Sequence, residues 1–199
     1  MFIMAFINSG LVIQLVYFKW IPKTEVPLVL NKYDSFSTEW YREIGSTIVI
    51  TLMLMVMMPH LANVTQMCFD GCRRCRDRNC NRDSRRTRKL AQEDYENVNT
   101  KREFMLEFRY SNMLTVLAVA FLYSGGMPIL YPVAALYFFI TYWFDKCTLF
   151  NCYRRPIKFD NYMARKTLDW YKYILLLHIV GFLLMHGQTP ILQNDLFGQ

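Results

Sequence analysis

Four long stretches of this sequence lack any Asp, Glu, Lys or Arg: residues 1–18, 44–69, 110–144 and 173–194. A helix that crosses a bilayer needs about 20 mostly apolar residues, so all four stretches are long enough, the first only just. A soluble protein would spread its charges over every amphipathic helix, whereas here nearly every charge falls between these stretches. The pattern therefore predicts an all-α integral membrane protein rather than a soluble helical bundle.

The chain also lacks the residue combinations on which common catalytic and binding chemistries depend. No nucleophile stands beside a base, no glycine-rich phosphate loop is present, and no pair of carboxylates is placed for acid–base work. We therefore expect no enzyme, no catalytic residue and no cofactor. The basic segments lack an aromatic platform, which argues against a nucleic-acid partner.

The first stretch lacks the marks of a secretory signal peptide. It has no basic leader before the apolar residues and no small-residue cleavage site after them, so we predict a membrane helix. Because this helix begins at Met1 without a flanking segment, we expect the chain to be the C-terminal part of a longer protein.

Positive charge is concentrated in two of the connections between the stretches. Residues 67–107 contain eleven Lys and Arg, and residues 145–172 contain seven. Residues 19–43 contain four, balanced by four acids, and the tail after Gly187 contains none. The positive-inside rule predicts that the two basic connections face the cytosol and that the other two segments lie outside.

The stretch 110–144 cannot be a single crossing, because that would put the two basic connections on opposite faces. As one helix it would reach roughly 52 Å, against a hydrocarbon core of about 30 Å. Its middle holds the strongest chain breaker, Ser-Gly-Gly-Met-Pro at residues 124–128. We predict a helical hairpin that enters the membrane and returns, its turn covered by protein or facing a wet cavity.

The predicted fold is a polytopic helical bundle with three spanning helices plus a two-arm helical hairpin. Residues 1–66 are predicted to form two transmembrane helices joined by an outer loop at 19–43, and residues 67–107 to form a basic cytosolic connection with a surface helix. The hairpin follows at 108–145 and a second basic cytosolic loop at 146–172. The last transmembrane helix and an outer tail occupy 173–199. We expect a multi-pass protein of the plasma membrane or endomembranes, with an organellar inner membrane as the alternative.

The hairpin carries the most specific sequence pattern. It reads Arg109-Tyr110, Tyr123-Ser124, Pro128-x3-Pro132-x3-Leu136-Tyr137, Asp145-Lys146, Leu149 and Arg154-Arg155-Pro156. This pattern resembles the superfamily of the anoctamins, the osmosensitive OSCA channels and the transmembrane channel-like proteins. Upstream, Gly45 and Pro59 keep the spacing of a glycine and a proline on the anoctamin pore-gating helix, and Phe6-Ile7-Asn8 with Phe18-Lys19 resembles the helix before it. The resemblance implies the same path across the membrane as the charges do.

By this resemblance the chain is a membrane transport protein, an ion channel or lipid scramblase, or a part of one. Anoctamins hold calcium with Asn, Glu and Asp; the matching positions here are Thr51, Met55, Arg109, Asn112, Thr141 and Asp145. Only Asp145 keeps a carboxylate, so we expect neither an anoctamin-type calcium site nor another metal, and we favour the tension-opened OSCA branch. Asp145 then either pairs with Arg109 or, with Thr51, Asn112 and Thr141, contributes to an ion pathway.

The hairpin turn, formed by Gly125, Gly126, Pro128 and Pro132, has two interpretations. The glycines can allow a tight turn and close helix approach, or they can act as a moving hinge. His178, inside the last apolar stretch, likewise either bonds to a neighbouring helix or relays protons, and we favour the bond.

The basic connection 67–107 brings thiols and cations close to the membrane. Cys68, Cys72, Cys75 and Cys80 could bind zinc, carry lipid or remain free thiols, and the spacing lacks the second, distant pair of a usual zinc site. We expect lipid headgroups to contact the run of Arg82, Arg85, Arg86, Arg88 and Lys89.

Two other functions compete with transport. The chain could be a small structural subunit of a larger membrane complex, or its basic connection could be a docking platform for lipid or cytosolic partners. In each case the expected partners are membrane lipids and other membrane chains, which would supply the missing helices.

Overall fold

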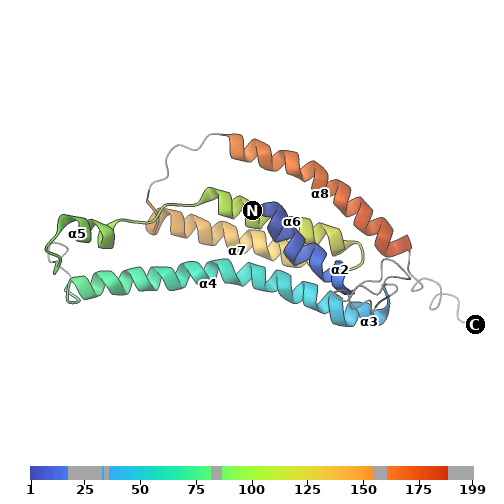
Figure 1. Cartoon of the computed structure of the whole chain (residues 1–199), viewed down its shortest axis with the longest axis horizontal. Coiled ribbons are helices and arrows are strands. Elements are labelled where there is room, and N and C mark those ends of the chain that lie inside the picture. The colour runs from blue at the N-terminus through green and yellow to red at the C-terminus, as the bar shows by residue number, and fades with distance from the viewer. Residues whose placement is uncertain (18–32, 34–35, 82–86, 155–160, 188–199) are drawn as a thin grey trace, which may run out of the picture. The chain divides into compact units, whose positions relative to one another are not determined.

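The computed structural model describes residues 1–17, 33, 36–81, 87–154 and 161–187 of the chain (Figure 1). The helices are α1 (Phe2–Phe6), the π-helical turn η1 (Ile7–Leu11), α2 (Val12–Tyr17), α3 (Thr38–Trp40), the π-helical turn η2 (Tyr41–Gly45), α4 (Ser46–Asp77), α5 (Gln92–Asn99), α6 (Leu106–Ser124), α7 (Leu130–Asn151) and α8 (Tyr162–Gly187). No extended strand occurs among the residues described, so the all-helical prediction is confirmed.

Two helical stretches among these residues are long and apolar enough to cross a membrane. They are Thr38–Asp77, which joins α3, η2 and α4, and α8 at Tyr162–Gly187. The N-terminal helix Phe2–Tyr17 is apolar but shorter than a full span. Three spans and a membrane hairpin therefore stay a prediction.

Several helix ends differ from the boundaries expected from the apolar stretches. Helix α4 runs on to Asp77 and α7 to Asn151, each past the end of its uncharged stretch, while the surface helix is only Gln92–Asn99. Helix α8 begins at Tyr162, eleven residues before its uncharged stretch. Backbone hydrogen bonds propagate a helix through polar residues as well, so an apolar stretch does not mark the helix ends.

The chain divides into two compact units. The first contains residues 1–55, 106–138 and 160–199, and the second contains residues 56–105 and 139–159. Helices α4 and α7 each begin in the first unit and end in the second.

Helix α6 lies at the centre of the first unit. Every residue from Leu114 to Ala120 is buried, so the helix is covered all round rather than on one stripe. Helix α1 and η1 pack against it, and so does α8 (Figure 1). The Phe2 ring also meets Trp170 of α8 edge-on, with centroids 5.2 Å apart.

The contact between α6 and α8 is a close approach of two helix backbones. A Cβ atom added to Gly181 would overlap the carbonyl oxygen of Leu122. One turn earlier, His178 Nδ1 lies 2.8 Å from the carbonyl oxygen of Phe121 and 3.3 Å from Ser124 Oγ. A carbonyl can only accept, so Nδ1 carries the proton and donates, which is the bond to a neighbouring helix that the sequence favoured.

The turn between α6 and α7 is tight, and its two glycines pack against other parts of the chain. A Cβ on Gly125 would lie 3.0 Å from Phe182 Cα, and one on Gly126 would lie 2.6 Å from the Tyr41 hydroxyl. Neither glycine has a positive φ, so these positions need glycine for close approach rather than for backbone freedom. Within the first unit, η2 and α8 thus contact the two glycines, while Pro128 and Ile129 of the same turn are exposed. A membrane position for this turn stays a prediction.

Both π-helical turns lie beside this hairpin turn. In η1 the Gly10 carbonyl accepts a hydrogen bond from the buried Tyr123 hydroxyl at 2.5 Å. In η2, Tyr41 reaches Gly126. A π turn widens a helix locally, and here η1 faces the last turn of α6 while η2 faces the residues that follow it.

We predict that Gly181→Ala weakens the first unit, because the new methyl group must displace the Leu122 backbone. Overpacking of this kind typically costs about 1–3 kcal/mol, so the apparent melting temperature in detergent should fall by about 5 °C. Gly71→Ala in α4 is the matched control, since nothing lies within 4 Å of its added Cβ. Equal melting temperatures for the two variants would contradict the proposed close packing.

Candidate functional site

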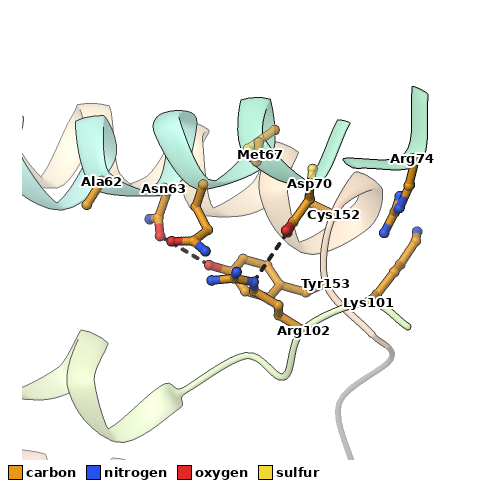
Figure 2. Close-up of a pocket in the computed structure, with 10 residues that line it drawn as sticks. Ala62, Asn63, Met67, Asp70, Arg74, Lys101, Arg102, Cys152 and Tyr153 are labelled. Carbon is orange, nitrogen blue, oxygen red and sulfur yellow. Dashed lines mark hydrogen bonds and ion pairs between the residues drawn. The ribbon is translucent and has the colours of Figure 1, made fainter. Parts of the chain in front are cut away.

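The second unit contains a polar pocket of about 160 Å³ (Figure 2). One wall is α4 from Ala62 to Arg74, and the other is formed by the segment before α6 and by Cys152 and Tyr153, which follow α7. Ten residues line the pocket: Ala62, Asn63, Gln66, Met67, Asp70, Arg74, Lys101, Arg102, Cys152 and Tyr153.

Backbone pairing holds the two sides of this pocket together. Arg102 and Tyr153 form an isolated β-bridge, and the Arg154 amide donates to the Arg102 carbonyl at 2.9 Å. Lys101 Nζ donates to the carbonyl of Asn151, also at 2.9 Å. The segment that enters α6 is thus tied to the segment that leaves α7.

Side chains from α4 complete the pocket. Arg102 Nε lies 3.2 Å from Asp70 Oδ2, and the Tyr153 hydroxyl donates to Asn63 Oδ1 at 3.3 Å (Figure 2). The ion pair is partly exposed, so by itself it contributes at most about 1 kcal/mol. Its larger effect is to neutralise one of the three cations that line the pocket.

The pocket therefore has an excess of positive charge. Arg74 donates through Nε to the Val98 carbonyl at 3.4 Å, and Lys101 donates to one carbonyl, so both keep further N–H groups for another acceptor. Neither of these two bonds is made to an acid. The pocket can accept a small anion such as a phosphate group.

A second, wider cavity of about 930 Å³ shares Lys101 and Tyr153 with the pocket and adds Arg154. Its wall includes Leu149 and Phe150, and the Phe150 side chain is 74% exposed. This cavity therefore has cations and an exposed apolar ring along the same wall.

The predicted pathway residues fall in both units. Thr51, Arg109 and Asn112 belong to the first unit, and Thr141 and Asp145 belong to the second. Thr51 Oγ1 donates to its own helix, to the Thr47 carbonyl at 2.8 Å. Pairing of Arg109 with Asp145 stays a prediction.

His60 is a buried polar residue of the second unit. Its side chain is only 7% exposed. Nε2 lies 3.2 Å from Thr141 Oγ1, and its ring packs on Phe144 with centroids 4.6 Å apart. The sequence contained one usable signal, an ionisable residue near the middle of an apolar stretch.

The four cysteines of the basic connection are exposed. Cys68, Cys72 and Cys75 follow one another at helical spacing on α4, and Cys80 comes after the helix end with a φ of 56°. Within the described part of the chain, no group of three or more His, Cys, Asp or Glu side chains could hold a metal ion. Lipidation of these thiols stays a prediction.

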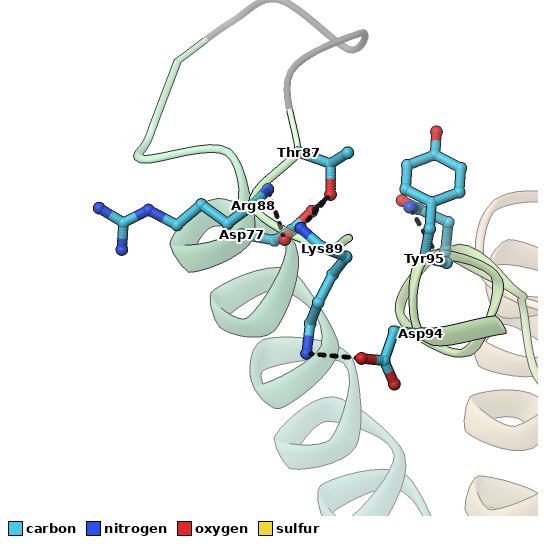
Figure 3. Close-up of polar contacts among 7 residues, drawn as sticks. Asp77, Thr87, Arg88, Lys89, Asp94 and Tyr95 are labelled. Carbon is cyan, nitrogen blue, oxygen red and sulfur yellow. Dashed lines mark hydrogen bonds and ion pairs between the residues drawn. The ribbon is translucent and has the colours of Figure 1, made fainter. Parts of the chain in front are cut away.

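The end of α4 and the following segment form a separate polar cluster (Figure 3). Asp77 accepts from the Thr87 hydroxyl at 2.8 Å and from the Arg88 amide at 3.2 Å. Lys89 Nζ lies 3.9 Å from Asp94 Oδ2, and the Arg88 side chain points away from Asp77 (Figure 3). The other predicted headgroup contacts, Arg82, Arg85 and Arg86, lie outside the described residues.

Comparison of the chain with protein-family models, with curated proteins and with solved structures found no match. The resemblance to the anoctamin and OSCA proteins therefore remains an expectation from the sequence.

We predict that the double variant Arg74→Gln/Lys101→Gln weakens binding of short-chain, water-soluble phosphatidic acid to the detergent-purified protein. Each cation at a headgroup contributes about 1 kcal/mol, so the dissociation constant should rise about 30-fold. The matched control is Arg165→Gln/Lys172→Gln on α8, in the other unit. An equal loss of binding in both double variants would mean that the attraction comes from net charge and not from this pocket.

Proposed function

We propose that this chain is an integral membrane protein and forms part of an assembly that transports ions or lipid. The membrane placement rests on apolar surface that the chain itself leaves uncovered. In the most apolar 18-residue segment of Thr38–Asp77, only 33% of the residues are buried. In the corresponding segment of Tyr162–Gly187, only 17% are buried. An apolar helix in the core of a soluble protein would be mostly covered.

The uncovered surface consists of large aliphatic side chains. On α8, Leu175, Leu176, Ile179 and Leu183 are each more than half exposed. On α4 the exposed face is rich in methionine, with Met57 62% and Met58 56% exposed. Lipid chains or helices of other chains would cover these faces, and methionine adapts well to irregular helix contacts.

The polar contact between α4 and α7 in the second unit favours a transport role. His60 and Thr141 meet within stretches that otherwise carry no charge, and Asp145 follows one turn later on α7. Buried polar and ionisable groups in membrane helices are costly and commonly mark substrate pathways. Thr141 and Asp145 are also two of the positions to which the anoctamin resemblance assigns a role.

Transport is tested on the assembly that copurifies with a tagged copy of the full chain, reconstituted into liposomes. We expect tension-activated current or fluorescent-lipid scrambling, and His60→Phe should reduce it about tenfold or more because the ring fills the same space without a polar atom. Thr65→Val, at an exposed residue bonded only within its own helix turn, should leave transport unchanged. Wild-type transport in His60→Phe would remove this contact from the pathway.

The alternative is a structural subunit that takes no part in transport. The methionine-rich face of α4 favours it, because such a face suits docking of a partner helix. Under this alternative, the double variant Met57→Lys/Met58→Lys should release partner chains during purification, whereas Arg73→Lys, on the polar part of α4, should not. A copurifying assembly without transport activity would support the subunit function.

A further inference from the structure

Helix α4 ends in a Schellman motif that brings two cysteines together. The Cys80 amide donates to the Cys75 carbonyl at 2.7 Å, and the Asn79 amide donates to the Arg76 carbonyl at 3.4 Å. These bonds are the 6→1 and 5→2 pair of the motif, and Asn79 takes its left-handed position with a φ of 54°. The side chains at the two ends of the 6→1 bond commonly touch in this motif, and here both are cysteines.

The side chains of Cys75 and Cys80, called the Schellman pair below, are in contact at the surface. Their thiols are hydrogen-bonded to each other, and both residues are exposed. Among the described residues other than glycine, only Asn79 and Cys80 have a positive φ. The chain thus adopts a rare backbone conformation at the point where the two sulfurs meet.

The neighbouring cysteines are less well placed to form a disulfide. Cys72 lies three residues before Cys75 within α4, where Cβ atoms are about 5–6 Å apart, against about 3.8 Å in a disulfide. Cys147 and Cys152 have the same separation in sequence as the Schellman pair. The Cys152 amide, however, donates to the Thr148 carbonyl as in a regular helix, in which residues five apart point about 140° away from each other.

Two arginines lie beside the Schellman pair. Arg76 and Arg88 line an open surface cavity of about 450 Å³ together with both cysteines of the pair. Guanidinium groups favour a thiolate over a thiol, and only the thiolate attacks a disulfide. They oppose the dipole of α4, whose C-terminal end disfavours negative charge. The same cations attract an anionic thiol reagent such as glutathione disulfide.

From this geometry we propose that Cys75 and Cys80 form a reversible disulfide with glutathione disulfide as the oxidant. One cysteine thiolate attacks a sulfur of glutathione disulfide and releases one glutathione, which leaves a mixed disulfide on the protein. The other thiolate attacks the protein sulfur of this mixed disulfide and releases the second glutathione. Two electrons pass from the protein to glutathione, and the two thiol protons end on the released glutathiones.

The disulfide fixes the end of α4. It closes residues 75–80 into a ring around the bond that ends the helix, so the left-handed residues can no longer change conformation freely. Asp77 lies inside this ring and accepts from the Thr87 hydroxyl and the Arg88 amide, so the start of the next segment is held as well. On the predicted cytosolic side the pair is reduced at rest, and its oxidation is a transient signal.

The test treats the full chain in detergent with glutathione buffers of increasing oxidised fraction, then blocks free thiols and digests with trypsin. Trypsin cleaves at the arginines between Cys72, Cys75 and Cys80, so each cysteine ends on its own peptide. Peptides that link Cys75 to Cys80 should be about tenfold more abundant than peptides that link Cys147 to Cys152. This comparison needs no variant.

Variants of Asn79 separate the backbone geometry from the presence of the thiols. Asn79→Gly keeps the left-handed position and should keep the disulfide. Asn79→Val places a β-branched residue there and should lower the equilibrium constant for oxidation about tenfold. Cys72→Ser should leave the linked peptides unchanged, whereas Cys80→Ser should leave Cys75 as a mixed disulfide with glutathione.

Three results would overturn the proposal. They are a link mainly between Cys72 and Cys75, equal linking of Cys147 with Cys152, and equal oxidation of Asn79→Val and Asn79→Gly. The inference does not depend on the transport role, so its failure would leave that role untouched.

Discussion

The close approach of α8 to α6 at Gly181 is the contact on which the first unit depends. Only glycine lets α8 come this near to the Leu122 carbonyl, and that distance brings His178 within hydrogen-bond range of Phe121. The same approach puts Phe182 against Gly125, so α8 also covers the turn between α6 and α7. A bulkier residue at position 181 would therefore disturb helix packing, an internal hydrogen bond and the turn together.

The partial cover of this turn restricts how the chain can lie in a membrane. Backbone at a turn cannot be exposed to lipid, because its polar groups would have no partner there. Here η2 and α8 cover Gly125 and Gly126, whereas Ile129 of the same turn is 58% exposed. The outward faces of α4 and α8 carry the exposed aliphatic side chains, and their chemistry is suited to lipid or to other helices.

The two units differ in the kind of ligand that they can accept. The second unit ties together its chain segments through the Arg102–Tyr153 bridge and gathers more cations than acids around a pocket. The first unit contains an apolar cavity whose walls come from the N-terminal helix, α6 and α8. The cations of the former keep N–H groups for a further acceptor, whereas the latter is lined mainly by apolar side chains.

Composition and local pattern alone determined the all-helical fold and the chain break at residues 124–128, since each depends on neighbouring residues or on charge placement. Contacts between distant segments were decided only by the tertiary structure. Close packing, not backbone freedom, explains why Gly125 and Gly126 are glycines. His60 is buried beside Thr141, which lies 81 residues further along the chain. No local pattern predicts such pairings, because they depend on how closely the side chains of two distant helices fit together, and many helices here have similar apolar faces.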